Sequence, residues 1–112
     1  MSPDPDAVQT IDAAMLFRLM STHQIVLVDV REPQEFLNQR IPGALLFPLS
    51  TFDPDALPPD GERRVVFHCG SGKRSLDAAQ RRLAAGATQA MHLGGGIAAW
   101  TAAGMPVVGP GY

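Results

Sequence analysis

The sequence predicts a single α/β domain built on a mainly parallel sheet. Short apolar runs at residues 25–30, 44–47, 65–67 and 90–93 alternate with segments of helical periodicity, a pattern typical of parallel strands joined by helices. The chain has 112 residues, enough for one hydrophobic core and too few for two. A hydrophobic content of 46% with 18% charged residues indicates a globular protein rather than a disordered one.

Capping residues and apolar spacing predict the first elements of the chain. Residues 1–7, with two prolines and two aspartates, are expected to form a disordered lead-in to a domain over residues 8–108. Thr10 suits the N-cap of a helix over about residues 11–20, where apolar residues recur at one-turn spacing. The almost continuous apolar run at residues 25–30 suits a parallel strand that is covered on both faces.

Charged residues surround the end of this strand. Asp29 lies at its C-terminal end, where open α/β sheets place their ligands, and Pro33 suits the first turn of a short helix. Arg31 and Glu35 are four residues apart, so they could pair across one helical turn. We interpret Asp29, Arg31 and Glu35 as supporting residues that hold this loop, rather than as reacting groups.

The middle of the chain is expected to be less regular. Residues 44–47 are too few for more than a small strand, which Pro48 would end. Residues 49–57 suit one irregular helical turn, and several prolines followed by Gly61 mark a surface loop. The apolar residues 65–67 then predict the next strand.

Helical periodicity returns in the last third of the chain. From Ser75 onward, Leu76, Ala79 and Leu83 fall on one helical face, and Gly86 suits the end of that helix.

A second unit of strand, turn and helix follows. Residues 90–93 predict a short strand, and the three glycines at 94–96 predict a tight turn. The helix after this turn carries Ile97 and Trp100 and is expected to end near Gly104.

The loop between the strand at 65–67 and the next helix is the most informative stretch. It contains the only cysteine of the chain and consists of Cys69, Gly70, Ser71, Gly72, Lys73, Arg74 and Ser75. A strand, a tight glycine loop and a helix N-terminus aim several backbone N–H groups at one point. A thiol at that point should have a lowered pKa and a stabilised anion. The stretch therefore indicates a cysteine nucleophile that acts on an anionic substrate.

Two glycine patterns invite a phosphate-binding interpretation, and neither fits. A P-loop requires Gly at position 67, where the chain has Phe67, and Ser or Thr after Lys73, where it has Arg74. The glycines at 94–96 lack the G-x-G-x-x-G spacing of dinucleotide sites because position 99 is Ala99.

The three histidines offer little for a metal site. His68 and Cys69 are adjacent on a strand and point to opposite faces, and no paired ligand spacing exists, so we expect neither a metal nor a cofactor. His92 is a candidate partner for the thiol only because strand ends lie close together. A lone cysteine is more often a buried apolar residue, but the glycine-rich, cationic surroundings favour a nucleophile.

Residues 69–75 resemble the active-site loop of single-domain rhodaneses, the thiosulfate sulfurtransferase family. The resemblance covers residues 10–107 and implies a five-stranded sheet flanked by helices. The chain departs from the family at Gln39-Arg40, where a Gly-His pair is usual, so a permanent cation replaces an imidazole. The other segments that agree with the family's order are Asp29-Val30-Arg31-Glu32-Pro33 with Glu35-Phe36, Ile41-Pro42-Gly43-Ala44, and Gly94-Gly95-Gly96-Ile97 with Trp100, Gly104 and Pro106.

This resemblance implies a sulfurtransferase that moves sulfane sulfur from thiosulfate, or a related donor, to cyanide or a thiol acceptor. Cys69 would attack the outer sulfur, release sulfite and hold the sulfur as a persulfide. Lys73 and Arg74 would attract the dianion, and the backbone N–H groups of residues 70–75 would stabilise the developing charge. Ser75 would cap the helix or donate a hydrogen bond to the sulfur.

Two other functions remain open. One is a cysteine phosphatase or arsenate reductase of the same fold, although the loop of those enzymes is one residue longer than the four residues between Cys69 and Arg74. The other is a carrier or binding module that delivers persulfide to a partner protein.

The composition gives no general reason to expect nucleic acid or a membrane as partner. The net charge is −2, and no apolar run approaches the length of a membrane span. A single cysteine cannot form an internal disulfide, and the acidic N-terminus lacks the features of a signal peptide. We therefore expect a cytoplasmic protein.

Overall fold

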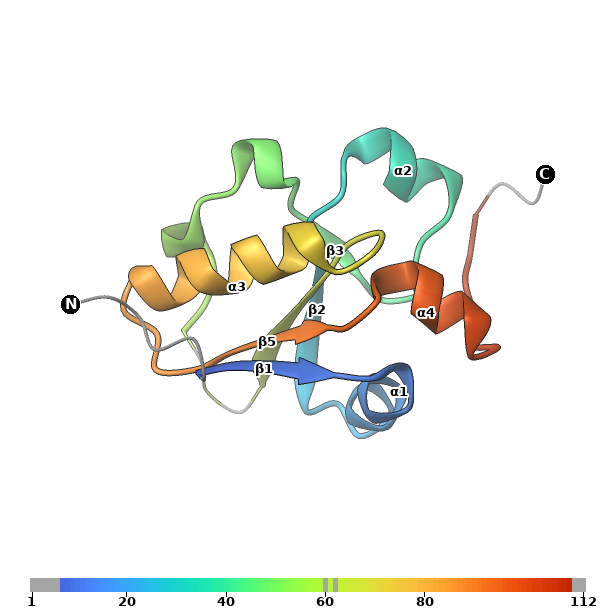
Figure 1. Ribbon diagram of the computed structural model, residues 1–112, viewed down its shortest axis with the longest axis horizontal. Helices are drawn as coiled ribbons and strands as arrows, with labels where there is room; N and C mark the ends of the chain where they lie inside the picture. Colours follow the sequence, from blue (N-terminus) through green and yellow to red (C-terminus); the bar gives the residue numbers. More distant parts are fainter. Residues whose placement is uncertain (1–6, 60, 62, 110–112) are drawn as a thin grey trace.

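The sheet has five strands, and every pairing between them is parallel. A computed structural model describes residues 7–59, 61 and 63–109 (Figure 1). The strand order is β1-β5-β4-β2-β3, which confirms the expected α/β fold with a parallel sheet. The strands are β1 (Val8–Ile11), β2 (Ile25–Asp29), β3 (Leu45–Leu46), β4 (Arg64–His68) and β5 (Ala90–Leu93). The helices are α1 (Ala13–Ser21), α2 (Pro33–Asn38), α3 (Lys73–Ala84) and α4 (Gly96–Ala102).

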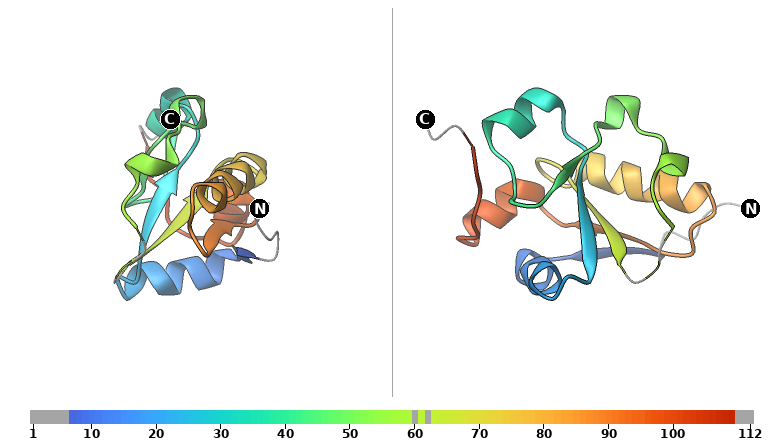
Figure 2. Two further views of the ribbon diagram at one scale, coloured as in Figure 1. Left: turned by 90° about the vertical axis from the view of Figure 1, so that its left-hand side faces the viewer. Right: turned by 180° about the vertical axis from the view of Figure 1, so that it is seen from behind.

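Helices cover both faces of the sheet (Figure 1 and Figure 2). On one face α1 and α4 enclose a core that includes Leu16, Val66 and Trp100. On the other face α3 encloses a core that includes Phe67 and Ala78. Adjacent residues of a strand point to opposite faces, so neighbouring residues of β4 belong to different cores. The loop that follows β4 contacts the first turns of both α3 and α4.

The N-terminal segment differs from the expectation. The strand β1 lies where the sequence pattern indicates the start of a helix, and α1 begins only after it. The N-cap is Asp12, whose carboxylate accepts a 2.8 Å hydrogen bond from the backbone N–H of Met15, so the assignment of Thr10 as N-cap is wrong. Pairing with β5 along its whole length satisfies the backbone groups on one edge of β1 and outweighs the local capping preference. The lead-in expected at residues 1–7 lies outside the described residues except for Ala7, which packs against the core.

The helix α3 begins at Lys73, earlier than its apolar pattern indicates. Its N-cap is Gly72, so Ser75 lies inside the first turn rather than at the cap. Ala79 and Leu83 are buried as expected, but Leu76 is 37% exposed. The prediction for Leu76 is wrong because the small, buried Ser75 takes the position that faces the sheet at this end of the helix.

The remaining elements lie close to their expected positions. The helix α2 has Pro33 in its first turn, and two short 3₁₀ turns cover Leu49–Thr51 and Pro54–Ala56. The glycines after β5 lead directly into α4. Within the described ranges of the chain, no helix is long and apolar enough to cross a membrane.

A buried cluster of Asp29, Arg31 and His68 lies at the C-terminal ends of β2 and β4. Asp29 is fully buried and accepts hydrogen bonds from the backbone N–H and the guanidinium of Arg31 at 2.8–3.1 Å. Nε2 of His68 lies 3.4 Å from Oδ2 of Asp29, and Arg31 also donates to the carbonyl of Gln39 at 2.6 Å. Burial alone would raise the pKa of Asp29, but the contacts with His68 and Arg31 hold this pKa well below its usual range. The cluster ties the loop after β2 to the end of α2.

We predict that Asp29→Asn destabilises the fold, because it leaves the guanidinium of Arg31 buried without a counter-ion. Removal of one partner from a buried pair costs about 3–5 kcal/mol, measurable by denaturant unfolding near neutral pH. Because the folded pKa of Asp29 is lowered, its contribution is present above the ordinary value of 3.8 and is lost as pH falls through the folded pKa. The difference in unfolding free energy between wild type and variant should therefore shrink in acid.

The matched control is Asp77→Asn, which breaks an exposed pair with Arg81 on α3. Such a pair is worth about 1 kcal/mol or less. Equal losses in the two variants would contradict the structural importance of the buried cluster.

Candidate functional site

The only cysteine lies just after β4, in a tight loop that leads into α3 (Figure 1). Cys69 is 1% exposed, and its Sγ accepts a hydrogen bond from the backbone N–H of Gly72 at 3.1 Å. The Oγ of Ser75 lies 3.6 Å from the same sulfur. The N-terminus of α3 thus points at the thiol, where its partial positive charge favours an anion.

Hydrogen-bond donors of the loop favour the ionised form of the thiol. Burial raises the pKa of Cys69, but the backbone N–H and side chain of Ser75, with the backbone N–H groups of Gly72 and Ser71, outweigh burial and lower this pKa. The thiol therefore loses its proton more readily than an ordinary cysteine, which is the property that a nucleophile requires.

The first turn of α4 holds the loop from its other side. The N–H groups of Ile97 and Ala98 donate to the carbonyl oxygens of Cys69 and Gly70 at 2.9 and 3.2 Å. Gly96 has a φ of +60°, and a Cβ at this position would collide with the carbonyl oxygen of Cys69. The glycines at the start of α4 thus allow a close backbone approach, in agreement with the tight turn indicated by the sequence.

A two-pronged ion pair joins α3 to α2 beside the loop. The guanidinium of Arg74 donates to both carboxylate oxygens of Glu35 at 2.8 and 3.0 Å, and these bonds lower the pKa of Glu35. The pairing of Arg31 with Glu35 that the sequence pattern indicates is wrong, because Arg31 binds Asp29 instead. Lys73 is exposed and has no ion pair among the described residues.

His92 is the residue whose position the sequence predicts least well. Its Nδ1 lies 2.9 Å from Oγ of Ser75, so it reaches the thiol through a hydroxyl rather than directly. Its Nε2 lies 3.0 Å from Oγ1 of Thr10, a residue absent from the sequence-based site. The side chain of His68 points away from the thiol of Cys69 and toward Asp29, as expected from strand alternation, although its Nδ1 lies 3.3 Å from the backbone carbonyl of Cys69.

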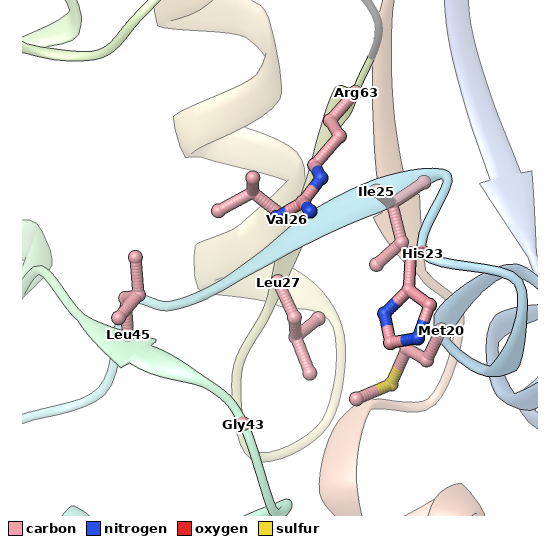
Figure 3. Close-up of a pocket in the computed structure, with 8 residues that line it drawn as sticks. All are labelled: Met20, His23, Ile25, Val26, Leu27, Gly43, Leu45 and Arg63. Carbon is pink, nitrogen blue, oxygen red and sulfur yellow. The ribbon is translucent and has the colours of Figure 1, made fainter.

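The described residues form no cluster that could hold a metal ion, and the pocket of Figure 3 lies apart from this site. Within the part of the chain that the structure describes, no group of three His, Cys, Asp or Glu side chains is placed to hold a metal ion. The pocket in Figure 3 has a volume of about 400 Å³ and lies beside α1 and β2. Its lining includes Met20, His23, Leu45 and Arg63, and no residue of the loop at 69–75.

We predict that Gly96→Ala destabilises the protein and displaces the loop, because the new methyl group would meet the carbonyl of Cys69. The matched control is Gly104→Ala, which has a similar φ of +77° but no heavy atom within 4 Å of its added Cβ. The control should lose about 1 kcal/mol through backbone strain alone, and Gly96→Ala about 1–3 kcal/mol more through the collision. Denaturant unfolding measures both values, and equal losses would contradict the role of the close contact.

A family model, related sequences and solved structures all match the same family. The family model of the rhodanese-like domain matches residues 12–103. A sulfurtransferase of Allochromatium vinosum is 36% identical over 104 residues, which cover 92% of this chain and 97% of that protein. An uncharacterized protein of Synechocystis sp. is 40% identical over 99 residues, which cover 88% of this chain and only 55% of that protein. The crystal structure of a rhodanese-related protein from Thermoplasma volcanium matches with a TM-score of 0.78 and 28% identity, and the match covers 89% of this chain and 97% of that one. The chain belongs to the rhodanese-like family of sulfurtransferases.

Proposed function

We propose that the protein takes sulfane sulfur from thiosulfate, or a related donor, and carries it as a persulfide on Cys69 to cyanide or a thiol. The observation that carries this proposal is the buried thiol itself, which lies at the N-terminus of α3 with a lowered pKa. Donors from Gly72 and Ser75 lie close enough to stabilise an anionic sulfur at this position.

The first half of the reaction would transfer sulfur to the protein. The thiolate of Cys69 attacks the outer sulfur of thiosulfate, so that a bond forms between Sγ and that sulfur. The sulfur–sulfur bond of thiosulfate breaks, and its electron pair leaves with sulfite. The loop N–H groups then hold the persulfide anion. In the second half, an acceptor anion attacks the terminal sulfur and returns an electron pair to the thiolate, in ping-pong order.

The size of the loop supports sulfur transfer over phosphoryl transfer. Four residues separate Cys69 from Arg74, whereas the loops of related cysteine phosphatases and arsenate reductases are one residue longer. The smaller ring of donors leaves too little room for a tetrahedral phosphoryl group in line with the thiolate. Both terminal nitrogens of the Arg74 guanidinium also bind the carboxylate of Glu35, which restricts the use of this group as a phosphate clamp.

The acceptor can be a small thiophilic anion or a protein thiol. A persulfide on a single-domain protein suits delivery to a partner, so the carrier role is included in the proposal. The net charge of −2 gives no general reason to expect nucleic acid as a partner. We expect the reaction to take place in the cytoplasm.

We predict that Cys69→Ser abolishes sulfur transfer and leaves the fold intact, because oxygen cannot form the persulfide and Cys69 is the only thiol. Intact mass after incubation with thiosulfate should show one added sulfur on the wild type, removable by cyanide, and none on the variant. Circular dichroism checks the fold. Transfer of sulfur from thiosulfate to cyanide by the folded variant would contradict the mechanism. Hydrolysis of aryl phosphates by the wild type that is lost in Cys69→Ser would identify a phosphatase instead.

We also predict that Lys73→Ala raises the KM for thiosulfate several-fold and changes kcat little, because Lys73 is exposed and attracts the dianion before reaction. The effect should shrink at high salt and for a singly charged thiosulfonate donor. Arg81→Ala is the matched control, since it removes the same charge from the far end of α3. Equal KM changes in both variants would assign the effect to net charge rather than to the loop.

A further inference from the structure

Four side chains, those of Cys69, Ser75, His92 and Thr10, form a continuous series of close polar contacts from the thiol to the surface, which we call the relay. Sγ of Cys69 lies 3.6 Å from Oγ of Ser75, which lies 2.9 Å from Nδ1 of His92. Nε2 of His92 lies 3.0 Å from Oγ1 of Thr10. The first three residues are buried, whereas Thr10 is exposed. Each member of this relay has groups that can both donate and accept a hydrogen bond.

The sheet register brings the relay together. Thr10 of β1 lies in register with His92 of β5, and His92 lies in register with Phe67 of β4. Residues in register point to the same face, and here this is the face that α3 covers. Ser75 in the first turn of α3 therefore meets His92, and Cys69 faces the same side as Phe67.

The hydroxyl proton of Ser75 has more than one acceptor within reach. The carbonyl of Gly72 is 3.2 Å away, and Nδ1 of His92 and the sulfur of Cys69 are the others. When Nδ1 carries no proton, the hydroxyl donates to it and offers only a lone pair to the thiol, which suits the S–H form. When Nδ1 carries a proton, His92 donates to the hydroxyl oxygen, and the hydroxyl proton can point at the thiolate.

We propose that His92 is a positioning residue for Cys69, which acts through Ser75 to remove the thiol proton and to direct the hydroxyl at the sulfur anion. This inference rests on the proposed function, in which Cys69 reacts as a thiolate.

The relay moves one proton from the thiol to the solvent and leaves no lasting imidazolium on His92. The S–H proton passes to Oγ of Ser75 while the hydroxyl proton of Ser75 passes to Nδ1 of His92. His92 gives its Nε2 proton to Thr10, and Thr10 gives a proton to water or a buffer base. The products are a thiolate, two unchanged hydroxyls and a neutral imidazole with its proton moved from Nε2 to Nδ1. Every hydrogen bond of the relay then points toward the sulfur.

Burial lowers the pKa of His92, which favours this exchange of tautomers over a lasting imidazolium. Other charged and titratable groups near the loop can also affect the pKa of the thiol. A variant at His92 keeps all of these groups, so any change in the thiol pKa can be assigned to His92. In the described part of the chain, β1 and α4 contribute none. Those on the other elements are Lys73 and Arg74 on α3, Glu35 on α2, Asp29 and Arg31 at the end of β2, and His68 on β4.

The rate of alkylation of Cys69 by iodoacetamide, followed over pH, tests the relay without any sulfur transfer. In His92→Phe the Ser75 hydroxyl returns to the carbonyl of Gly72, so the thiol pKa should rise by about one unit and alkylation below that pKa should slow about tenfold. Ser75→Ala should have the same effect, and the double variant should add little to it. His92→Asn keeps an amide donor near the place of Nδ1 and should recover much of the wild-type profile.

Met91→Leu is the matched control, because it changes the neighbouring residue of β5 on the opposite face. It should leave the alkylation profile unchanged. Profiles of His92→Phe and His92→Asn that both superpose on that of the wild type would overturn the proposal.

Ring ¹⁵N shifts of the wild type give a measurement that needs no variant. His92 should carry its proton on Nε2 below the thiol pKa and on Nδ1 above it, and one unchanged tautomer would overturn the relay. Uptake of sulfur from thiosulfate, measured by mass on the same wild-type protein, tests the proposed function separately. If the thiol pKa depends on His92 but the protein takes up no sulfur, the proposed function is refuted and the relay is kept. If the protein takes up sulfur but the thiol pKa does not depend on His92, the relay alone is refuted.

Discussion

The site depends on the direction of two peptide groups in the loop after β4. The carbonyl oxygens of Cys69 and Gly70 accept hydrogen bonds from the first turn of α4. In a planar trans peptide the N–H points opposite to the carbonyl, so the N–H groups of Gly70 and Ser71 turn away from α4. The N–H of Ser71 is one of the groups that lower the pKa of Cys69. The close approach of α4, which requires glycine at position 96, thus fixes the polarity of the loop around the sulfur.

Strand alternation separates the charged part of the site from its neutral part. Asp29 and His68 are paired in register on β2 and β4, and their side chains form the buried ionic cluster. His92 and Thr10, in register with Phe67, lie on the face that holds the thiol. Charges that hold the loop after β2 therefore lie across the sheet from the sulfur. Around the sulfur itself, the donors are neutral N–H and O–H groups.

The sequence predicts the elements whose signal is local. The apolar runs locate β2, β4 and β5, and the glycines and cations locate the loop at residues 69–75. It misses β1, because a strand of four residues gains its stability from pairing with β5 and not from its own pattern. It also indicates a pair between Arg31 and Glu35 that does not form, since the choice for Glu35 between a neighbour and Arg74, 39 residues away, is made by the packing of α2 beside α3. The contact of His92 with Ser75 has the same origin: it requires the strand register, which no local pattern contains.

In the proposed function, the loop attracts anions and stabilises the sulfur anion through different residues. The charge of Arg74 is largely offset by Glu35 in a two-pronged pair, so Lys73 is the uncompensated cation of the loop among the described residues. Lys73 is exposed and acts through solvent, where its field is screened within about 10 Å. The N–H groups of the loop act on the buried sulfur, where the lower dielectric strengthens each hydrogen bond. The intrinsic nucleophilicity of a thiolate falls as its pKa falls. A permanent cation in contact with the sulfur would lower this pKa more than neutral donors do, because charge-assisted hydrogen bonds are stronger, and would leave a weaker nucleophile. The arrangement suits the proposed role of Cys69, in which the thiol accepts a sulfur atom and then releases it.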